Sequence, residues 1–295
     1  MLLKRINNFI NRPDVQQNVF TAIVKRLTWR LHWAISKRPY VVDFAKTLKI
    51  SLPQSGSASL IYYQGLSEYE TADFVERVLK PGMTFLDIGA HIGEYTLLAA
   101  QLVGSEGKVY AFEPQPSLFP ILAKNVKQNG LEHVELNQTA VSNSEGKIEF
   151  AVASESSVSS IRNNASDESK YKLIHVKSVS LDNFWSKHTG RIDLIKIDVE
   201  GAEKLVFEGA KRLMNLDSSQ SPIWLFEYAP TAYTKFDYQA KDLLELLQTY
   251  GYKIYRYLES GKFRNFSPEQ DCKGIINLVA AKDLDRVSGL TLQNS

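Results

Sequence analysis

Residues 85–93 read Phe85-Leu86-Asp87-Ile88-Gly89-Ala90-His91-Ile92-Gly93, an apolar strand followed by a loop with two glycines. In an open α/β sheet, ligands bind beyond the carboxyl ends of the strands. Glycine there lets the backbone approach a ligand that a Cβ would exclude, and Asp87 can accept hydrogen bonds from an ammonium group. The G-x-x-x-G spacing differs from the G-x-G-x-x-G of dinucleotide sites. The segment therefore predicts a cofactor site that is not of the dinucleotide type.

Strands alternate with helices around this segment. Apolar runs predict strands at 84–88, 108–112, 134–137, 193–198 and 223–228. Amphipathic spacing predicts helices at 67–79, 93–102, 117–129, 202–214 and 240–250. Such alternation implies parallel strands with helical crossovers, covered on both faces. The fold class is therefore α/β with a doubly wound sheet, and strands at 252–257 and 275–281 are expected to add an antiparallel pair at one end.

Residues 146–181 interrupt the alternation. Strands are expected at 147–153 and 175–179, with a polar stretch rich in Ser and Asn between Ser154 and Lys170. We expect this stretch to be a surface loop or lid near the site, or a merely disordered loop.

The first 40 residues are strongly basic. They contain eight Lys or Arg against Asp14 alone, a net charge of +7, so the other 255 residues of this +2 chain sum to −5. Apolar residues from Val15 to Ile35 recur at spacings of three and four, as in an amphipathic helix. This helix either lies on a membrane surface or a partner, or packs on its own domain with a solvated basic side.

Composition places the chain among globular proteins. It is 44% hydrophobic over 295 residues, enough for a substantial core without disulfides. Cys272 is its only cysteine, has no nucleophile motif around it and fits a reducing compartment. We find no signal peptide and no apolar run long enough for a membrane span, so we expect a cytoplasmic protein, with peripheral membrane contact through residues 1–40 as the alternative.

Carboxylates gather at the ends of three further strands. Glu113 ends the strand 24 residues after Gly89, where it can accept the ribose hydroxyls of an adenosine. Asp198, Glu200 and Glu203 follow the strand expected beside the first, and such crowding is unfavourable unless cations or hydrogen-bond donors relieve it. They can remove a proton from an acceptor hydroxyl, contact a cofactor ammonium or hold a divalent metal. Glu203 also suits the first turn of a helix.

Glu227 ends a further strand on the same edge of the sheet, and it is followed by two tyrosines. Tyr228 and Tyr233 line an acceptor pocket or simply pack in the core. His91, in the glycine loop, acts as a base or as a local hydrogen-bond partner. The sequence has no P-loop lysine motif and no G-x-S-x-G elbow, so a kinase or hydrolase has no support.

Together these motifs resemble the FkbM family of methyltransferases over about residues 65–230. The resemblance rests on Pro81-Gly82, Asp87 to Gly93, Phe112-Glu113-Pro114, Asn125-Val126, Asn129, Ile197-Asp198-Val199-Glu200-Gly201-Ala202-Glu203 and Gly209-Ala210. It implies a seven-stranded class I methyltransferase fold and transfer of a methyl group from S-adenosyl-L-methionine to a hydroxyl oxygen of a sugar, a glycoconjugate or a secondary metabolite. His91 is a departure, because the family often has Asn there.

The resemblance also implies roles for individual residues. Those implied in cofactor binding are Asp87, Gly89, Ala90, His91, Gly93, Glu113, Pro114, Ala140, Val141 and Asp198. Those implied at the reaction centre are Asp198 and Glu200, and Glu227 is a third catalytic candidate because of its place at the end of the neighbouring strand. Whether a divalent metal holds the substrate is left open.

The expected domain plan has three parts. Residues 1–60 form a basic, partly helical extension, 61–285 the methyltransferase domain and 286–295 a C-terminal tail. We expect a small-molecule or glycan acceptor and no nucleic acid. The alternatives are an NAD-dependent sugar-nucleotide oxidoreductase and a non-catalytic membrane-associated binding protein.

Overall fold

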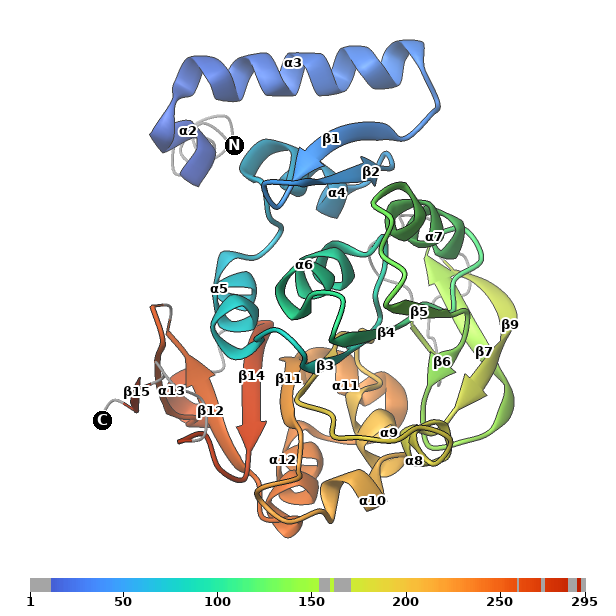
Figure 1. Cartoon of the computed structure of the whole chain (residues 1–295), viewed down its shortest axis with the longest axis vertical. Helices are drawn as coiled ribbons and strands as arrows, with labels where there is room; N and C mark the ends of the chain where they lie inside the picture. Colours follow the sequence, from blue (N-terminus) through green and yellow to red (C-terminus); the bar gives the residue numbers. More distant parts are fainter. Residues whose placement is uncertain are drawn as a thin grey trace. The chain divides into compact units, whose positions relative to one another are not determined.

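The computed structural model describes residues 12–153, 160–161, 171–258, 260–271, 274–285 and 291–292 (Figure 1). Lys4, Arg5, Cys272 and nearly all of the polar stretch after Ala153 lie outside these residues. The chain forms two compact units, divided between Tyr69 and Glu70. No helix among the described residues has the length and hydropathy needed to cross a membrane.

The N-terminal unit combines helices with a β-hairpin. Its elements are α2 (Pro13–Gln17), α3 (Val19–Ile35), β1 (Tyr40–Phe44), β2 (Leu48–Leu52) and α4 (Gly56–Gln64). The helix expected from Val15 to Ile35 is interrupted at Asn18, which is extended and accepts a hydrogen bond from the Thr21 N–H as the N-cap of α3. Helix α4 begins after Ser55, whose hydroxyl accepts a hydrogen bond from the Ala58 N–H as the N-cap. The expected boundary after residue 60 falls inside α4.

Helix α3 is held in this unit by aromatic side chains on one face. Trp29 is buried and stacks on Tyr62 with 5.4 Å between ring centroids, and Tyr40 and Tyr63 meet it edge-on. Most of the apolar residues that predicted the helix lie on the other side, where the exposed ones are Val19, Phe20, Ile23, Val24, Leu27, Leu31 and Ile35. The amphipathic pattern therefore does not mark the buried face.

A large sheet organises the second unit. Its strands run in the order β15-β13-β12-β14-β11-β10-β3-β4-β5. Their bounds are β3 (Thr84–Ile88), β4 (Lys108–Phe112), β5 (Val134–Asn137), β10 (Leu194–Ile197), β11 (Ile223–Tyr228), β12 (Lys253–Tyr257), β13 (Lys262–Asn265), β14 (Ile276–Ala281) and β15 (Thr291–Leu292). Strands β5, β4, β3, β10 and β11 are parallel, whereas β14 is antiparallel to both β11 and β12. The doubly wound α/β sheet of seven mostly parallel strands is confirmed, and β13 and β15 extend its edge.

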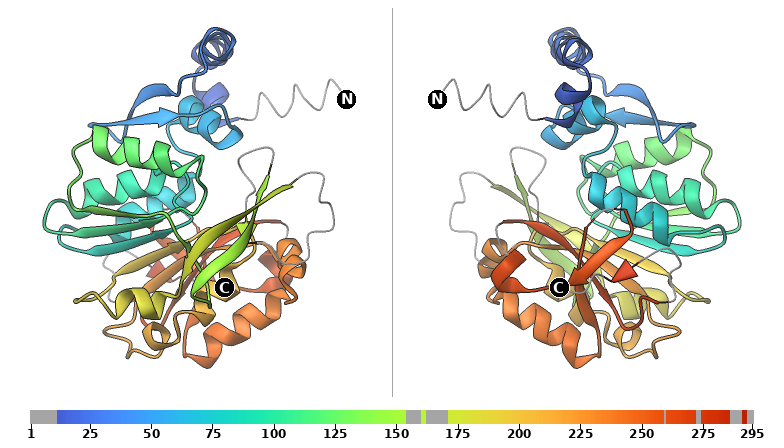
Figure 2. Two further views of the ribbon diagram at one scale, coloured as in Figure 1. Left: turned by 90° about the vertical axis from the view of Figure 1, so that its right-hand side faces the viewer. Right: turned by 90° about the vertical axis from the view of Figure 1, so that its left-hand side faces the viewer.

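Helices cover both faces of this sheet (Figures 1 and 2). One face carries α5 (Tyr69–Val78), α6 (Glu94–Val103) and α7 (Phe119–Gln128). The other carries α8 (Leu181–Trp185), α9 (Glu203–Glu208), α10 (Lys211–Met214) and α12 (Ala240–Thr249). Short helical turns α11 (Pro230–Tyr233), η2 (Thr234–Phe236) and α13 (Pro268–Asp271) complete the unit. Burial on both faces explains the continuous apolar runs of the parallel strands.

A second sheet follows β5. Its order is β6-β9-β7-β8, with bounds β6 (Ala140–Val141), β7 (Gly146–Ala153), β8 (Ser160–Ile161) and β9 (Tyr171–Val179). The expected strands 147–153 and 175–179 are confirmed as β7 and β9, which pair antiparallel.

The single helix expected over 202–214 is wrong, because the chain forms α9 and α10 instead. At the break, the Gly209 carbonyl accepts a hydrogen bond from the Asp182 N–H at 2.9 Å. The Asp182 carboxylate in turn accepts from the N–H groups of Arg212 and Leu213, at 2.8 and 3.1 Å. A tertiary contact thus starts a new helix, which local spacing does not reveal.

Candidate active site

The predicted site residues converge at the topological switch point of the sheet. Strand β3 pairs with β10 on one side and with β4 on the other, and all three are parallel. Connections leave the carboxyl ends of β3 and β10 in different directions, which opens a crevice in doubly wound sheets. Asp87 and Gly89 come from β3 and its loop, Glu113 follows β4, and Asp198 follows β10.

Gly89 permits a close contact between the loops after β3 and β10. Its φ is +81°, and its N–H donates to the Phe112 carbonyl at 3.0 Å. A Cβ at this position would lie 1.9 Å from the Asp198 carbonyl oxygen. The atoms that require glycine here therefore belong to the chain itself, in addition to any ligand.

Asp87 is a buried carboxylate with one unsatisfied oxygen. Its side chain is 1% exposed, and its Oδ2 accepts a hydrogen bond from the Thr96 hydroxyl at 2.6 Å. Its Oδ1 is buried with no hydrogen-bond partner among the described residues. Burial raises the pKa of Asp87, whereas the neighbouring Lys196 lowers it. A donor or a cation placed beside Oδ1 would therefore stabilise the ionised form.

Lys196 is a functional candidate that we did not identify from the sequence. It lies opposite Asp87 in the β3–β10 register and is only 4% exposed. Its Nζ is 3.0 Å from Asp198 Oδ2 and 4.9 Å from the ring centroid of Tyr95. A buried ammonium is costly unless it is paired, so a lysine inside a strand covered on both faces was a usable signal.

Glu113 joins the loops that follow β3 and β4. It is buried and accepts hydrogen bonds from the backbone N–H groups of His91 (2.9 Å) and Gln115 (2.8 Å). His91 adopts a positive φ of 53°, which presents its N–H to this carboxylate. Burial raises the pKa of Glu113 to about 7, although both N–H groups oppose the shift. Glu113 thus fixes the glycine loop, and its contact with a ribose stays a prediction.

Three glutamates surround the end of β10. Glu203, the first residue of α9, is fully buried, and its Oε1 accepts from the Val199 and Gly201 N–H groups at 3.2 Å each. Burial raises its pKa to about 7. Glu203 therefore shapes the loop that presents Glu200. Burial and then the nearby Asp198 raise the pKa of Glu200 to about 8, and the same two causes raise that of Glu227.

The tyrosines after Glu227 pack inside the protein. Tyr228 and Tyr233 are both buried and meet edge-on, with 5.8 Å between ring centroids. The Tyr233 hydroxyl accepts a hydrogen bond from the Ala229 N–H and donates to the Glu227 carbonyl, so it fixes the turn that follows β11. These contacts favour packing over lining an acceptor pocket.

The remaining predicted residues are spread around the same edge. Ala90 is buried in the glycine loop, and Pro114 directly follows Glu113. Ala140 and Val141 form β6, where both are buried and pair with Ser178 and Val179 of β9. Within the described ranges, no group of three or more His, Cys, Asp or Glu is arranged to hold a metal ion.

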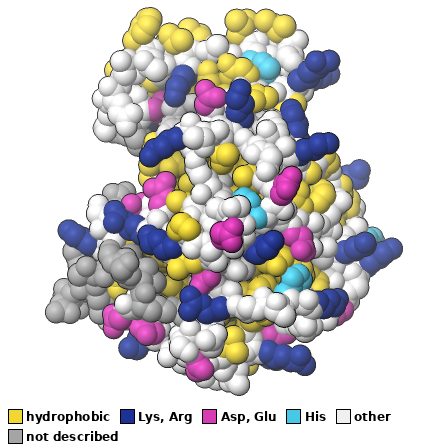
Figure 3. Space-filling model, in the orientation of Figure 1, with side chains coloured by type: hydrophobic (Ala, Val, Ile, Leu, Met, Phe, Trp, Pro, Cys, Tyr) yellow, Lys and Arg dark blue, Asp and Glu magenta, His cyan; other side chains and the backbone are white. Residues whose placement is uncertain are grey.

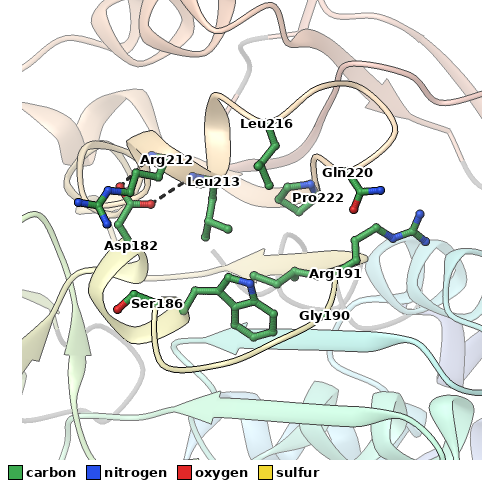
Figure 4. Close-up of a pocket in the computed structure, with 11 residues that line it drawn as sticks. Asp182, Ser186, Gly190, Arg191, Arg212, Leu213, Leu216, Gln220 and Pro222 are labelled. Carbon is green, nitrogen blue, oxygen red and sulfur yellow. Dashed lines mark hydrogen bonds between the residues drawn. The ribbon is translucent and has the colours of Figure 1, made fainter.

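A cavity of about 310 Å³ lies near the amino ends of strands β10 and β11 (Figure 4). Its lining includes Gly190 to Ile192, just before β10, and Pro222, just before β11. Trp185 and Leu213 supply apolar surface. Because this cavity is at the amino ends of the strands, it is separate from the carboxylates described above.

Comparison with known proteins finds a matching family model and partial similarity to curated methyltransferases. Residues 87–254 match the methyltransferase FkbM domain. A probable cobalt-precorrin-6B C(15)-methyltransferase (decarboxylating) from Sulfolobus acidocaldarius is 40% identical over 55 residues, 19% of this chain and 29% of that protein. Protein-L-isoaspartate O-methyltransferase from Caenorhabditis elegans is 26% identical over 108 residues, 37% of this chain and 41% of that protein. The chain thus spans less than half the length of these curated relatives.

Solved methyltransferase structures are also similar to this chain, at low identity. A precorrin-6y C5,15-methyltransferase from Geobacter metallireducens has a TM-score of 0.42 and 14% identity, covering 74% of this chain and 90% of its own. A fibrillarin from Aeropyrum pernix, with natively bound S-adenosyl-L-methionine, has a TM-score of 0.41 and 12% identity, covering 72% and 73%.

Proposed function

This chain belongs to the FkbM methyltransferase family, and we propose that it transfers a methyl group from S-adenosyl-L-methionine to a hydroxyl oxygen of a sugar, a glycoconjugate or a secondary metabolite. The observation that supports this most is the crowding of buried and half-buried carboxylates at the switch point, with Asp87 Oδ1 lacking a partner among the described residues. Lys196 supplies one compensating positive charge. A positively charged ligand would supply a second and so stabilise the ionised form of the remaining carboxylates.

The residues present fit this cofactor. Asp87 would accept hydrogen bonds from its ammonium, and the segment from Gly89 to Gly93, with Ala90 and His91, would surround its methionine part. Glu113 and Pro114 would meet the ribose. Ala140 and Val141 would flank the adenine. When bound, the cofactor supplies a methyl group on a positively charged sulfur, which is a good leaving group.

The chain's own residues then have two tasks. The first is to align the acceptor oxygen for direct displacement, which depends on a fixed geometry. The Lys196–Asp198 pair and the Glu203 contacts fix the loop after β10 for this purpose. The second task is to remove the hydroxyl proton. Asp198, Glu200 and Glu227 are the candidates.

The raised pKa values of Glu200 and Glu227 bear on this choice. A carboxylate whose pKa is about 8 is a stronger proton acceptor than an ordinary carboxylate, provided that it is ionised when the acceptor binds. Lys196 lowers the pKa of both glutamates. A cationic ligand at the same edge would act in the same direction.

Neutral variants of the three candidates test the proton acceptor. We expect the variant that removes the base, among Asp198→Asn, Glu200→Gln and Glu227→Gln, to lose roughly 10²- to 10⁴-fold in kcat, because general-base catalysis contributes that much. Glu200→Gln and Glu227→Gln should leave the affinity for S-adenosyl-L-homocysteine close to that of wild type, because neither residue is implied in cofactor binding. The measurement is transfer of a labelled methyl group to the acceptor, beside calorimetric binding of S-adenosyl-L-homocysteine.

The acceptor comes from a screen of glycan, lipid and small-molecule extracts with labelled cofactor, followed by mass spectrometry of the product. RNA and protein fractions belong in the same screen, because our proposal excludes nucleic acid and the curated relatives include a protein methyltransferase.

Glu245→Gln, an exposed change on α12, is the matched control for the three site variants and should leave turnover unchanged. Full turnover in all three site variants, with intact cofactor binding, would make the base assignment wrong.

A further inference from the structure

Helix α3 exposes a continuous apolar stripe along its whole length. Phe20, Ile23, Val24, Leu27, Leu31 and Ile35 recur at spacings of three and four, which places them on one side of a helix. Their exposed fractions run from 43% at Ile23 to 78% at Phe20. Figure 3 shows hydrophobic side chains gathered over this helix. At 1.5 Å per residue the stripe is about 22 Å long.

The opposite side of α3 is already occupied. Ala22 and Trp29 are buried, and Arg26 pairs with Asp14 at 2.6 Å while stacking over the Tyr63 ring. Lys25 donates to the Tyr63 carbonyl at 3.0 Å. These contacts orient the helix, so the stripe faces outward because of how α3 packs in its own unit. Exposed apolar area this contiguous marks an interaction surface in soluble proteins.

The charge around the stripe indicates which kind of surface it suits. From Arg12 to Arg38 the chain has six Lys or Arg and a single acidic residue, Asp14. Arg30 is exposed on α3, and Lys37 and Arg38 are exposed just after it. Two copies of this segment would repel each other if their stripes met, whereas an anionic surface would attract it. Basic side chains beside an apolar helix face are the arrangement of helices that lie in a membrane interface.

We propose that α3 docks this protein on anionic lipid bilayers, with the Phe20–Ile35 stripe buried among the acyl chains and Arg30, Lys37 and Arg38 at the lipid phosphates. This surface is separate from the proposed methyl transfer and does not depend on it.

Sedimentation of the full chain with phosphatidylcholine vesicles, with and without 30 mol% phosphatidylglycerol, tests the proposal. We expect binding to the anionic vesicles only. The stripe variant Phe20→Ser/Leu27→Ser/Leu31→Ser should bind them at least about tenfold more weakly, because apolar burial supplies much of the affinity. The charge variant Arg30→Gln/Lys37→Gln/Arg38→Gln should bind several-fold more weakly and lose part of the salt dependence.

Matched controls separate this surface from general hydrophobicity. Leu216→Ser/Ile275→Ser removes two exposed apolar residues elsewhere and should bind as wild type does. The stripe variant should keep wild-type affinity for S-adenosyl-L-homocysteine, which shows that it is folded. If the wild-type protein itself does not bind S-adenosyl-L-homocysteine, that result counts against the proposed function and not against the membrane surface.

Two results would overturn the proposal. One is absence of binding to anionic vesicles, or equal binding by wild type and the stripe variant. The other is a wild-type dimer in sedimentation velocity that the stripe variant dissociates, without vesicle binding by either protein. In that second case the stripe would be a contact between copies of the chain.

Discussion

Gly89→Ala is expected to destabilise the protein by about 3 kcal/mol or more and to abolish binding of S-adenosyl-L-homocysteine. Two costs add. The φ of +81° costs a residue with a Cβ roughly 1–2 kcal/mol. In addition, the new Cβ would lie 1.9 Å from the Asp198 carbonyl oxygen, and relieving that overlap separates the loops after β3 and β10. Urea unfolding, followed by calorimetric titration of the folded fraction, measures both effects.

Gly82→Ala is the matched control for this prediction. Gly82 has nearly the same φ, +84°, but an added Cβ there would meet nothing within 4 Å. It should therefore cost only the conformational part, about 1–2 kcal/mol, and leave cofactor binding intact. Equal losses in the two variants would show that the contact between the loops contributes nothing beyond backbone strain.

Lys196→Met is expected to cost about 3 kcal/mol at pH 8, because it leaves the buried Asp87 without its neighbouring cation and the partly exposed Asp198 without its ion pair. The cost should shrink toward pH 5.5. A carboxyl group whose folded pKa is raised contributes stability below its unfolded pKa, and this contribution is lost as the pH rises through the folded pKa. For Glu200 that window runs from about 4.5 to about 8.

The wild-type free energy of unfolding should therefore fall across this window. Lys196→Met should steepen the fall, because Lys196 lowers the pKa of Glu200 and its removal would raise that pKa further. Urea titrations at pH 5.5 and pH 8 measure the slopes. Lys204→Met is the control, since Lys204 also pairs with a carboxylate, Glu208, and lies over a ring, that of Tyr238. It is more exposed, so about 1 kcal/mol or less is expected. Similar losses in the two variants would contradict a special role for Lys196.

Sequence patterns predicted the sheet well because the strands are short apolar runs between clear turn signals. Strands β3, β4, β5 and β11 match their expected bounds residue for residue. The position of the site was also predictable, since parallel strands bring their carboxyl ends together. Lys196 was not predicted, because site residues were expected after the strands, whereas this lysine lies within β10, opposite Asp87 of β3 and paired with Asp198.

The failures have a common physical cause. The break between α9 and α10 depends on Asp182, which is 30 residues from Arg212 in sequence. The buried face of α3 depends on Tyr40 and Tyr62, which come from other elements. The amphipathic pattern of α3 therefore marked a surface that its own unit leaves exposed. Periodicity reports that a face is apolar, and only tertiary contacts decide whether that face is covered.

Calorimetric titration of the full chain with S-adenosyl-L-homocysteine and with NAD, on wild type and Asp87→Asn, tests the central claim most directly. Asparagine keeps the shape and can still accept from Thr96, but it removes the charge that the ammonium would meet. We predict one S-adenosyl-L-homocysteine site in wild type, roughly ten- to a hundredfold weaker binding in Asp87→Asn, and no binding of NAD. Tighter binding of NAD, or S-adenosyl-L-homocysteine binding that Asp87→Asn leaves unchanged, would contradict the account.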